Sequence, residues 1–285
     1  MKAKKSLGQN FLKSELVLKK IIEAGEIKPN DIILEIGPGK GALTEKLLEH
    51  ANLAVAVEKD YELFEFLKIK FAEQITSGSL VLVHDDILRF DINEEILKLN
   101  EKKSEEKFSQ VLGSPRPARP DHSKTFPLIS FKIIANIPYN ITGAILKKFL
   151  SEKHQPELMV LMVQHEVATR ILARDGKESI LSISVKAYGE PEMITKVDKR
   201  YFSPMPKVNS AVIKISNISR RLFIENNINE EKFWEIVKTG FAHKRKKLSS
   251  NLKGLNYYQE ESLINLGNKR AEDLTLIDWI ALAKM

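Results

Sequence analysis

Short apolar runs alternate with amphipathic stretches along the first two thirds of the chain. The apolar runs are rich in β-branched residues, which is typical of buried strands. They lie at about 32–36, 54–58, 80–83, 131–135 and 158–163. Helical patterns lie near 14–24, 42–49, 61–73, 142–152 and 165–173. Strands that alternate with helices predict an α/β fold with a doubly wound, mostly parallel sheet and a ligand site at the strands' carboxyl ends.

The last third of the chain has a different pattern. No crossover helix clearly separates residues 180–188 from residues 210–215, so we expect these two segments to be strands at an antiparallel edge. Helical patterns follow at 229–241, 257–266 and 275–283. Asn229 and Thr275 are plausible N-caps. The pattern predicts an α/β domain and a small all-helical C-terminal domain, at residues 1–216 and 217–285.

Three alternating glycines follow the first predicted strand, in the segment Gly37-Pro38-Gly39-Lys40-Gly41. Glycine lets the backbone approach a ligand closely, so we expect a nucleotide-type ligand at this turn. In a dinucleotide site the third glycine falls three positions after the second, but here it falls two positions after it. The Lys-Ser/Thr pair of a P-loop is also missing. The ligand is therefore expected to carry no phosphates.

Acidic residues follow the next two predicted strands. Glu58 lies 21 positions after Gly37, where a doubly wound fold places an acid that accepts both ribose hydroxyls. Asp86 follows the third strand and suits the exocyclic amine of an adenine. Taken singly, each acid is better explained as a solvated loop residue or a helix N-cap. Their order at successive strand ends favours an adenosine held by side chains.

The segment Asn136-Ile137-Pro138-Tyr139 closes the fourth predicted strand. Pro138 cannot donate to a strand ladder and disfavours helix at the residue before it, so the chain must turn with its carbonyls unpaired. An amide, free carbonyls and a phenol ring suit a flat amine such as adenine or cytosine. A tight turn with a packed Tyr139 explains the segment equally well when it is considered alone.

The composition excludes several kinds of site. The chain has 285 residues, of which 43% are apolar, enough for one large and one small domain. It has no cysteine, which excludes disulfides and thiolate metal sites, and its six histidines show no ligand spacing. No run approaches the roughly 18 apolar residues of a membrane span, and no secretory signal is recognisable. We expect a cytoplasmic, monomeric enzyme without a metal or a membrane partner.

Positive charge is concentrated at the end of the chain. Residues 196–285 contain 17 Lys plus Arg and 10 Asp plus Glu, so their formal net charge of +7 equals that of the whole chain. An acid-free cluster contains Lys244, Arg245, Lys246 and Lys247, and a second one contains Lys2, Lys4, Lys5 and Lys13. These clusters predict polyanion binding, although a solvated helix face explains such a run equally well by itself.

A series of motifs resembles the KsgA-type ribosomal RNA adenine dimethyltransferases, which use S-adenosyl-L-methionine. The resemblance covers nearly the whole chain and ends in the basic segment near residue 244. The motifs are Lys5-Ser-Leu-Gly-Gln9-Asn10-Phe-Leu12, Glu35-Ile-Gly-Pro-Gly39, Val57-Glu58-Lys-Asp, Asp86, Asn136-Ile-Pro-Tyr-Asn140, Gln164-His-Glu-Val-Ala-Thr-Arg170 and Phe202-Ser-Pro-Met-Pro-Lys-Val-Asn-Ser-Ala-Val212. Their number and order carry the resemblance. It implies a Rossmann-like class I methyltransferase domain.

The resemblance also implies roles for individual residues. The cofactor-binding residues would be Gln9, Asn10 and Leu12 across the cofactor, Gly37 and Gly39 at its methionine part, Glu58 at its ribose, and Asp86 and Ile87 at its adenine. Lys59 would be a further cofactor-binding residue. Asn136 would touch both the cofactor and the target adenine. The catalytic group would be Asn136, Ile137, Pro138, Tyr139 and Phe202, with the two aromatic rings stacking on an extruded base. Lys244, Arg245, Lys246 and Lys247 would bind RNA.

The implied activity is dimethylation of the exocyclic amines of adjacent adenosines in a small-subunit ribosomal RNA hairpin, within a pre-ribosomal particle late in assembly. Two alternatives stay open: a large-subunit methyltransferase of the macrolide-resistance type, and a non-catalytic RNA-binding assembly factor. A nicotinamide oxidoreductase is disfavoured by the glycine spacing. The sequence departs from the family pattern in the long, Pro-rich stretch 100–127, which we expect to be a surface loop, and at His165.

Overall fold

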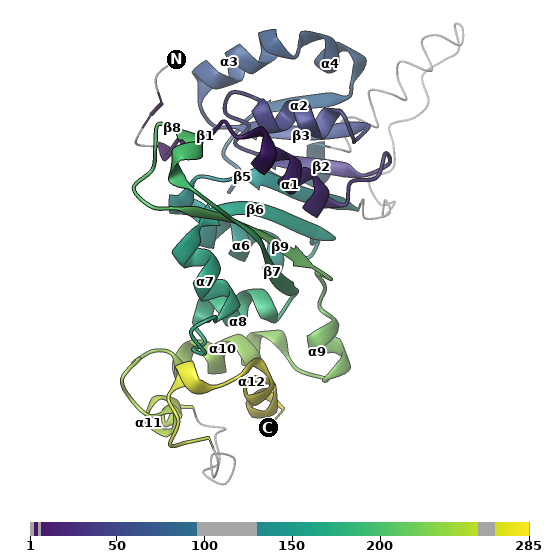
Figure 1. The fold of residues 1–285 in the computed structure, drawn as a ribbon. Helices are drawn as coiled ribbons and strands as arrows, with labels where there is room; N and C mark the ends of the chain where they lie inside the picture. Colours follow the sequence, from purple (N-terminus) through teal and green to yellow (C-terminus); the bar gives the residue numbers. More distant parts are fainter. Residues whose placement is uncertain (1–2, 5–6, 96–129, 256–265, 285) are drawn as a thin grey trace, which may run out of the picture.

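A twisted seven-stranded sheet forms the centre of the molecule, with helices on both of its faces (Figure 1). The computed structural model describes residues 3–4, 7–95, 130–255 and 266–284. The strand order is β4-β3-β2-β5-β6-β9-β7. The strands are β2 (Ile32–Ile36), β3 (Leu53–Glu58), β4 (Leu80–His84), β5 (Phe131–Asn136), β6 (Leu158–Gln164), β7 (Glu190–Val197) and β9 (Ser210–Ser216).

The strands from β4 to β6 are parallel, whereas β9 is antiparallel to both β6 and β7. The predicted α/β class and the mostly parallel sheet are therefore confirmed. A second, two-stranded sheet pairs β1 (Phe11–Leu12) with β8 (Phe202–Ser203). No pattern in the sequence predicts this pair, because each of its strands has only two residues.

Helices connect the strands largely where periodicity places them. The predicted helix 61–73 is divided at Phe71 into two helices, α3 and α4. The helices around the sheet are α1 (Glu15–Gly25), α2 (Ala42–Leu48), α3 (Tyr61–Lys70), α4 (Ala72–Ser77), α6 (Thr142–Ser151), α7 (His165–Leu172) and α8 (Ile180–Lys186). Single 3₁₀ turns occupy Tyr139–Ile141, Lys199–Tyr201 and Ala271–Asp273.

The prediction of a strand at 180–188 is wrong, because most of this segment forms helix α8. A capping box starts the helix: the Ser179 hydroxyl accepts from the backbone N–H of Ser182, and the Ser182 hydroxyl accepts from that of Ser179. The edge strand is instead β7, which the polar residues and Pro191 conceal in the sequence. Proline is tolerated there because β7 lies at the edge of the sheet.

The C-terminal part is helical, as predicted. It contains α9 (Arg221–Glu225), α10 (Glu230–Gly240), α11 (Leu248–Leu252) and α12 (Leu276–Ala283). The predicted N-caps are confirmed: Asn229 Oδ1 accepts from Lys232 N at 2.9 Å, and Thr275 Oγ1 accepts from Asp278 N at 3.3 Å. The helix predicted at 257–266 and the loop predicted at 100–127 lie almost entirely outside the described residues.

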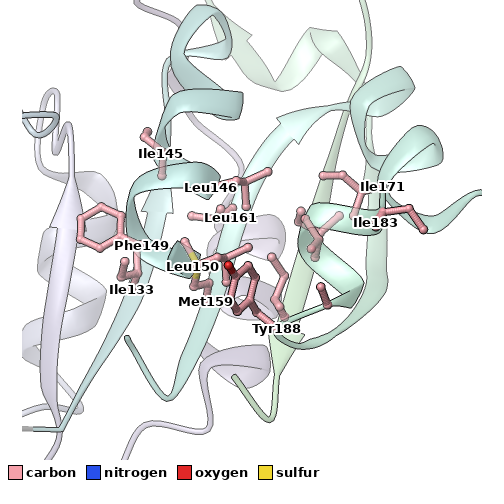
Figure 2. Close-up of a cluster of buried hydrophobic side chains, with 14 of the residues drawn as sticks. Ile133, Ile145, Leu146, Phe149, Leu150, Met159, Leu161, Ile171, Ile183 and Tyr188 are labelled. Carbon is pink, nitrogen blue, oxygen red and sulfur yellow. The ribbon is translucent and has the colours of Figure 1, made fainter. Parts of the chain in front are cut away.

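The core consists of layers on the two faces of the sheet. Alternate residues of each strand enter opposite layers: Ile133 of β5 lies beside Phe149 of α6 (Figure 2), and Ile134 faces α1. Figure 2 shows the first layer, where side chains of α6, α7 and α8 cover β5 and β6. This layer continues through Tyr188 and Phe233 to Trp279 of α12, so the helical tail shares the core of the sheet. The boundary at residue 217 stays a prediction.

Candidate active site

A cavity of about 480 Å³ lies at the carboxyl ends of the parallel strands β2 to β5. The turns after neighbouring parallel strands meet at the same edge of a sheet, which explains why residues far apart in the sequence line one space. Of the predicted cofactor-binding and catalytic residues, those that line it are Gln9, Asn10, Leu12, Gly37, Gly39, Glu58, Lys59, Asp86, Ile87, Asn136, Ile137, Pro138 and Tyr139.

The glycine turn after β2 has a backbone that other residues rarely adopt. Gly37, Gly39 and Gly41 have φ angles of 65°, 61° and 79°. A Cβ atom on Gly39 would lie 3.0 Å from the ring of Phe11, and one on Gly41 would lie 2.5 Å from the ring of Phe71. The turn therefore requires glycine for its backbone conformation, and Gly39 and Gly41 are also required because aromatic rings pack closely against them.

Glu58, the last residue of β3, has a buried carboxylate that orders the glycine turn. Its Oε2 accepts from the N–H of Gly39 at 3.1 Å, and its Oε1 accepts from the N–H of Asp60 at 2.9 Å. The residue is only 5% exposed, and this burial raises the pKa of the Glu58 carboxyl although both hydrogen bonds act in the opposite direction. Each oxygen keeps a lone pair with which it can accept a further hydrogen bond.

Asp86 follows β4 and is held by two neighbours. Its Oδ2 lies 2.8 Å from Nζ of Lys59, and its Oδ1 accepts from the N–H of Leu88 at 3.0 Å. The hydrogen bond from the Lys59 ammonium is the main cause that lowers the pKa of Asp86, and the Leu88 N–H adds to it. Asp86 is thus an ionised acceptor beside the buried side chain of Ile87.

Asn136 is the last residue of β5 and pairs with Met162 of β6. Its Nδ2 donates to the carbonyl of Asn10 at 3.2 Å, and among the described residues Oδ1 remains available as the acceptor end of the amide. The carbonyl of Ile137 follows the last paired residue of β5, and Pro138 then turns the chain into a 3₁₀ turn. Two oxygen acceptors therefore follow one another at this strand end.

The two predicted stacking residues lie in different places. Tyr139 lines the cavity and is partly exposed, and its hydroxyl lies 2.6 Å from Oγ of Ser210. Burial raises the pKa of the Tyr139 phenol, so the ring is neutral at ordinary pH. Phe202 does not line the cavity. Its side chain is 3% exposed and packs in the core layer. There it contacts the same cluster as Leu12 of β1, which is its cross-strand partner across the β1–β8 pair.

The N-terminal segment is tied to the cavity by contacts that the sequence does not predict. Gln9 donates from Nε2 to Oδ2 of Asp60 at 2.8 Å, and its Oε1 accepts from the N–H of Lys4 at 2.7 Å. The ammonium of Lys4 reaches Oδ1 of Asp60 at 2.7 Å. Gln9 thus touches Asp60, two residues after Glu58, and its predicted place across the cofactor stays a prediction.

Glu35 is a buried acid of the cavity that the sequence indicates only as part of a motif. It lies in β2, is 1% exposed and accepts a hydrogen bond of 2.6 Å from the hydroxyl of Thr44. Burial raises the pKa of the Glu35 carboxyl from 4.5 to about 8. An acid inside an otherwise apolar strand was the signal that could have identified it.

The predicted RNA-binding residues lie away from the cavity, between α10 and α11. Lys244, Arg245, Lys246 and Lys247 are all exposed there, and the ammonium of Lys247 donates to Oδ1 of Asn268 at 2.9 Å. Lys4 of the N-terminal cluster pairs with acids instead, whereas Lys13 is exposed. Within the described residues there is no group of three or more metal-ligating side chains and no helix with the length and apolar character of a membrane span.

Proteins of known family are similar in sequence to this chain over its whole length. The family model for ribosomal RNA adenine dimethylase matches residues 1–285. A ribosomal RNA small subunit methyltransferase A from Dehalococcoides mccartyi is 37% identical over 286 residues, which cover 98% of this chain and 87% of the relative. The protein of the same description from Fusobacterium nucleatum is 35% identical over 292 residues, covering 100% of this chain and 97% of the relative.

Solved structures share the fold. A dimethyladenosine transferase from Plasmodium falciparum has a TM-score of 0.71 and 25% identity, and the match covers 95% of each chain. The 23S rRNA methyltransferase ErmE has a TM-score of 0.68 and 24% identity, over 96% of this chain and 98% of that one. The Rossmann-like methyltransferase fold expected from the resemblance is confirmed. The chain belongs to the ribosomal RNA adenine dimethylase family and is a methyltransferase enzyme.

Proposed function

We propose that the protein dimethylates the exocyclic amines of adjacent adenosines in a small-subunit ribosomal RNA hairpin, with S-adenosyl-L-methionine as the methyl donor. One observation carries this proposal: acceptors from three strand ends, Glu58, Asp86 and Asn136, line a single cavity together with the glycine turn. Relatives described as small-subunit methyltransferases support the choice of substrate.

The residues of the cavity suit this cofactor. A volume of about 480 Å³ is in the range of small-molecule sites, roughly 300–1,000 Å³. Glu58 has an ordered carboxylate that can accept the two ribose hydroxyls, and Asp86 beside Ile87 can accept the amine of an adenine. The glycine turn would approach the methionine part, and Gln9 and Asn10 would lie across the cofactor. When bound, the cofactor supplies a methyl group from its sulfonium, and the thioether that remains is a neutral leaving group.

The chain's own contribution is to position the target amine. The lone pair of an adenine amine is delocalised into the ring, so the amine is a poor nucleophile. Asn136 Oδ1 and the Ile137 carbonyl would accept its two hydrogens and favour a pyramidal nitrogen. The hydrogen bonds to these acceptors become stronger as positive charge develops on the nitrogen. The methylated nitrogen then loses a proton to solvent, so no side chain is assigned as a general base.

Tyr139 would stack on the extruded base, because its ring lines the same cavity as the amine acceptors. Phe202 would have to change its packing to reach the base, since its side chain is buried in the core. After the first methylation the amine has only one hydrogen left, which a single acceptor can hold. The acceptors at Asn136 and Ile137 must then tolerate a methyl group in place of the first hydrogen.

The C-terminal helices would bind the RNA. The exposed segment of Lys244, Arg245, Lys246 and Lys247 can contact phosphates while the cavity accepts the base. We propose that the partner is a pre-ribosomal small-subunit particle, late in its assembly, and that the protein acts on it as a cytoplasmic monomer.

The test is a transfer assay with methyl-labelled cofactor and two purified acceptors, immature small-subunit particles and naked large-subunit RNA. The proposal predicts label in the small-subunit RNA. Label in the large-subunit RNA alone would support the macrolide-resistance type of activity. RNA binding without any transfer to either acceptor would support a non-catalytic assembly factor.

A further inference from the structure

The hydroxyl of Ser210 is a buried polar group that the proposed mechanism does not use. The residue is the first of β9, is 0% exposed, and belongs to the motif that follows Phe202 in the sequence. Its Oγ lies 2.6 Å from the hydroxyl oxygen of Tyr139, 71 residues earlier in the chain. Either oxygen can donate this hydrogen bond, which is short and therefore well formed.

Ser210 is held firmly by the sheet on both sides. It pairs with Gln164 of β6 in one ladder and with Val197 of β7 in the other. A residue between two antiparallel partners has little freedom to move its Cα atom. The serine hydroxyl is therefore held in a fixed position next to the Tyr139 hydroxyl, although Ser210 itself does not line the cavity.

Tyr139 is held less firmly by its own backbone. It follows Pro138 and begins a 3₁₀ turn of three residues, a short element with weak hydrogen-bond geometry. Its ring is partly exposed to the cavity. Since the hydroxyl is the ring's single polar atom, the bond to Ser210 is what fixes the far end of the ring.

We propose that Ser210 is a positioning residue, which sets the plane of the Tyr139 ring and thereby the place of the extruded base. This inference rests on the proposed function. A base that stacks on Tyr139 takes its tilt from that ring, and its amine must also meet Asn136 and the Ile137 carbonyl. An error in the ring plane moves the amine away from these acceptors, and methyl transfer is sensitive to displacements of this kind.

The test combines Ser210→Ala, Tyr139→Phe and the double variant, each of which removes one or both hydroxyls. Ser216→Ala is the matched control, because it makes the same change in the same strand away from the cavity. Single-turnover methyl transfer and cofactor affinity are measured for each. The side-chain signal of tyrosine labelled with ¹³C at Cζ reports the hydrogen bond independently, and Tyr139→Phe assigns it.

We expect Ser210→Ala and Tyr139→Phe each to slow methyl transfer about 2- to 10-fold, the range of one hydrogen bond, with the cofactor affinity unchanged. The double variant should be no slower than either single variant, because both remove the same interaction. Ser210→Thr, which keeps the hydroxyl, should restore the rate. Ser210→Ala should move the Tyr139 Cζ signal, and Ser216→Ala should leave it in place.

Three outcomes would overturn the inference: a wild-type rate in Ser210→Ala, a double variant whose loss is the product of the single losses, or an unmoved Cζ signal. If Ser210→Ala does not fold, Tyr139→Phe and Ser210→Thr decide the question, since the tyrosine is partly exposed. A wild-type protein that transfers no methyl to any adenosine would instead refute the proposed function. In that case the Cζ signal still shows whether Ser210 holds the ring.

Discussion

Replacement of Glu35 by glutamine should change how the stability of the protein depends on pH. The carboxyl is 1% exposed and bonded only to the hydroxyl of Thr44 among the described residues, so the folded state favours its neutral form. Its pKa is raised from 4.5 to about 8. A carboxyl with a raised folded-state pKa contributes stability that is complete below the unfolded pKa and is lost as the pH rises through the folded pKa.

The magnitude follows from the two pKa values. Between about pH 5 and pH 8, the unfolded state ionises and the folded state does not, which removes about 2–4 kcal/mol of unfolding free energy from the wild type. Glutamine has nearly the same shape and does not titrate, so Glu35→Gln lacks this term. Ionisable groups that do not interact with Glu35 contribute equally to both proteins and cancel in the difference.

The assay is urea denaturation of both proteins at several pH values in this interval, with the unfolding free energy extrapolated to water. As the pH rises, the unfolding free energy of the wild type should fall relative to that of Glu35→Gln. A difference that stays constant across the interval would refute the burial argument, because it would show that Glu35 ionises equally in the folded and unfolded states.

Further predictions concern the turn, the N-terminal segment and the tail. Gly39→Ala should weaken cofactor binding and lower the unfolding free energy by about 1–2 kcal/mol, because φ is 61° and the new Cβ atom would lie too close to the ring of Phe11. Calorimetry measures the cofactor affinity and denaturation measures the stability; a wild-type affinity would contradict the role of the turn. Gln9→Ala should make the N-terminal segment easier for a protease to cut, since it loses the bond to Asp60; an unchanged cleavage rate would refute this. Lys244→Ala with Lys246→Ala should make the slope of log K against log salt for RNA binding less steep, by about 0.7–0.9 for each phosphate that the variant no longer neutralises. Lys153→Ala, which replaces an exposed lysine just after α6, should leave this slope unchanged.

The sequence predicts the strands at the centre of the sheet because they are buried on both faces. Their apolar runs are continuous, and each ends at a residue with distinct chemistry, such as Glu58 or Asn136. The cavity follows directly from this pattern, since parallel order brings those ends together. The prediction fails at the edge of the sheet, where β7 is polar and contains Pro191, and where the apolar run after Ser179 is a helix.

Contacts between distant segments account for the rest. The bonds of Gln9 to Asp60 and of Tyr139 to Ser210 join residues that are 51 and 71 positions apart. No periodicity encodes such pairs, because they depend on where the finished fold places two polar side chains. Phe202 illustrates the same limit: its motif is recognisable, but the pairing of β1 with β8 turns its ring into the core.

In the proposed reaction the cavity holds a target adenine whose amine meets Asn136 and the Ile137 carbonyl. The most direct measurement compares wild type with Asn136→Ala on immature small-subunit particles, by mapping methylated adenines and by measuring RNA affinity. We expect the wild type to dimethylate two adjacent adenosines, and Asn136→Ala to lose this modification while it retains its RNA affinity. Unchanged dimethylation by Asn136→Ala would show that its side chain does not position the target amine.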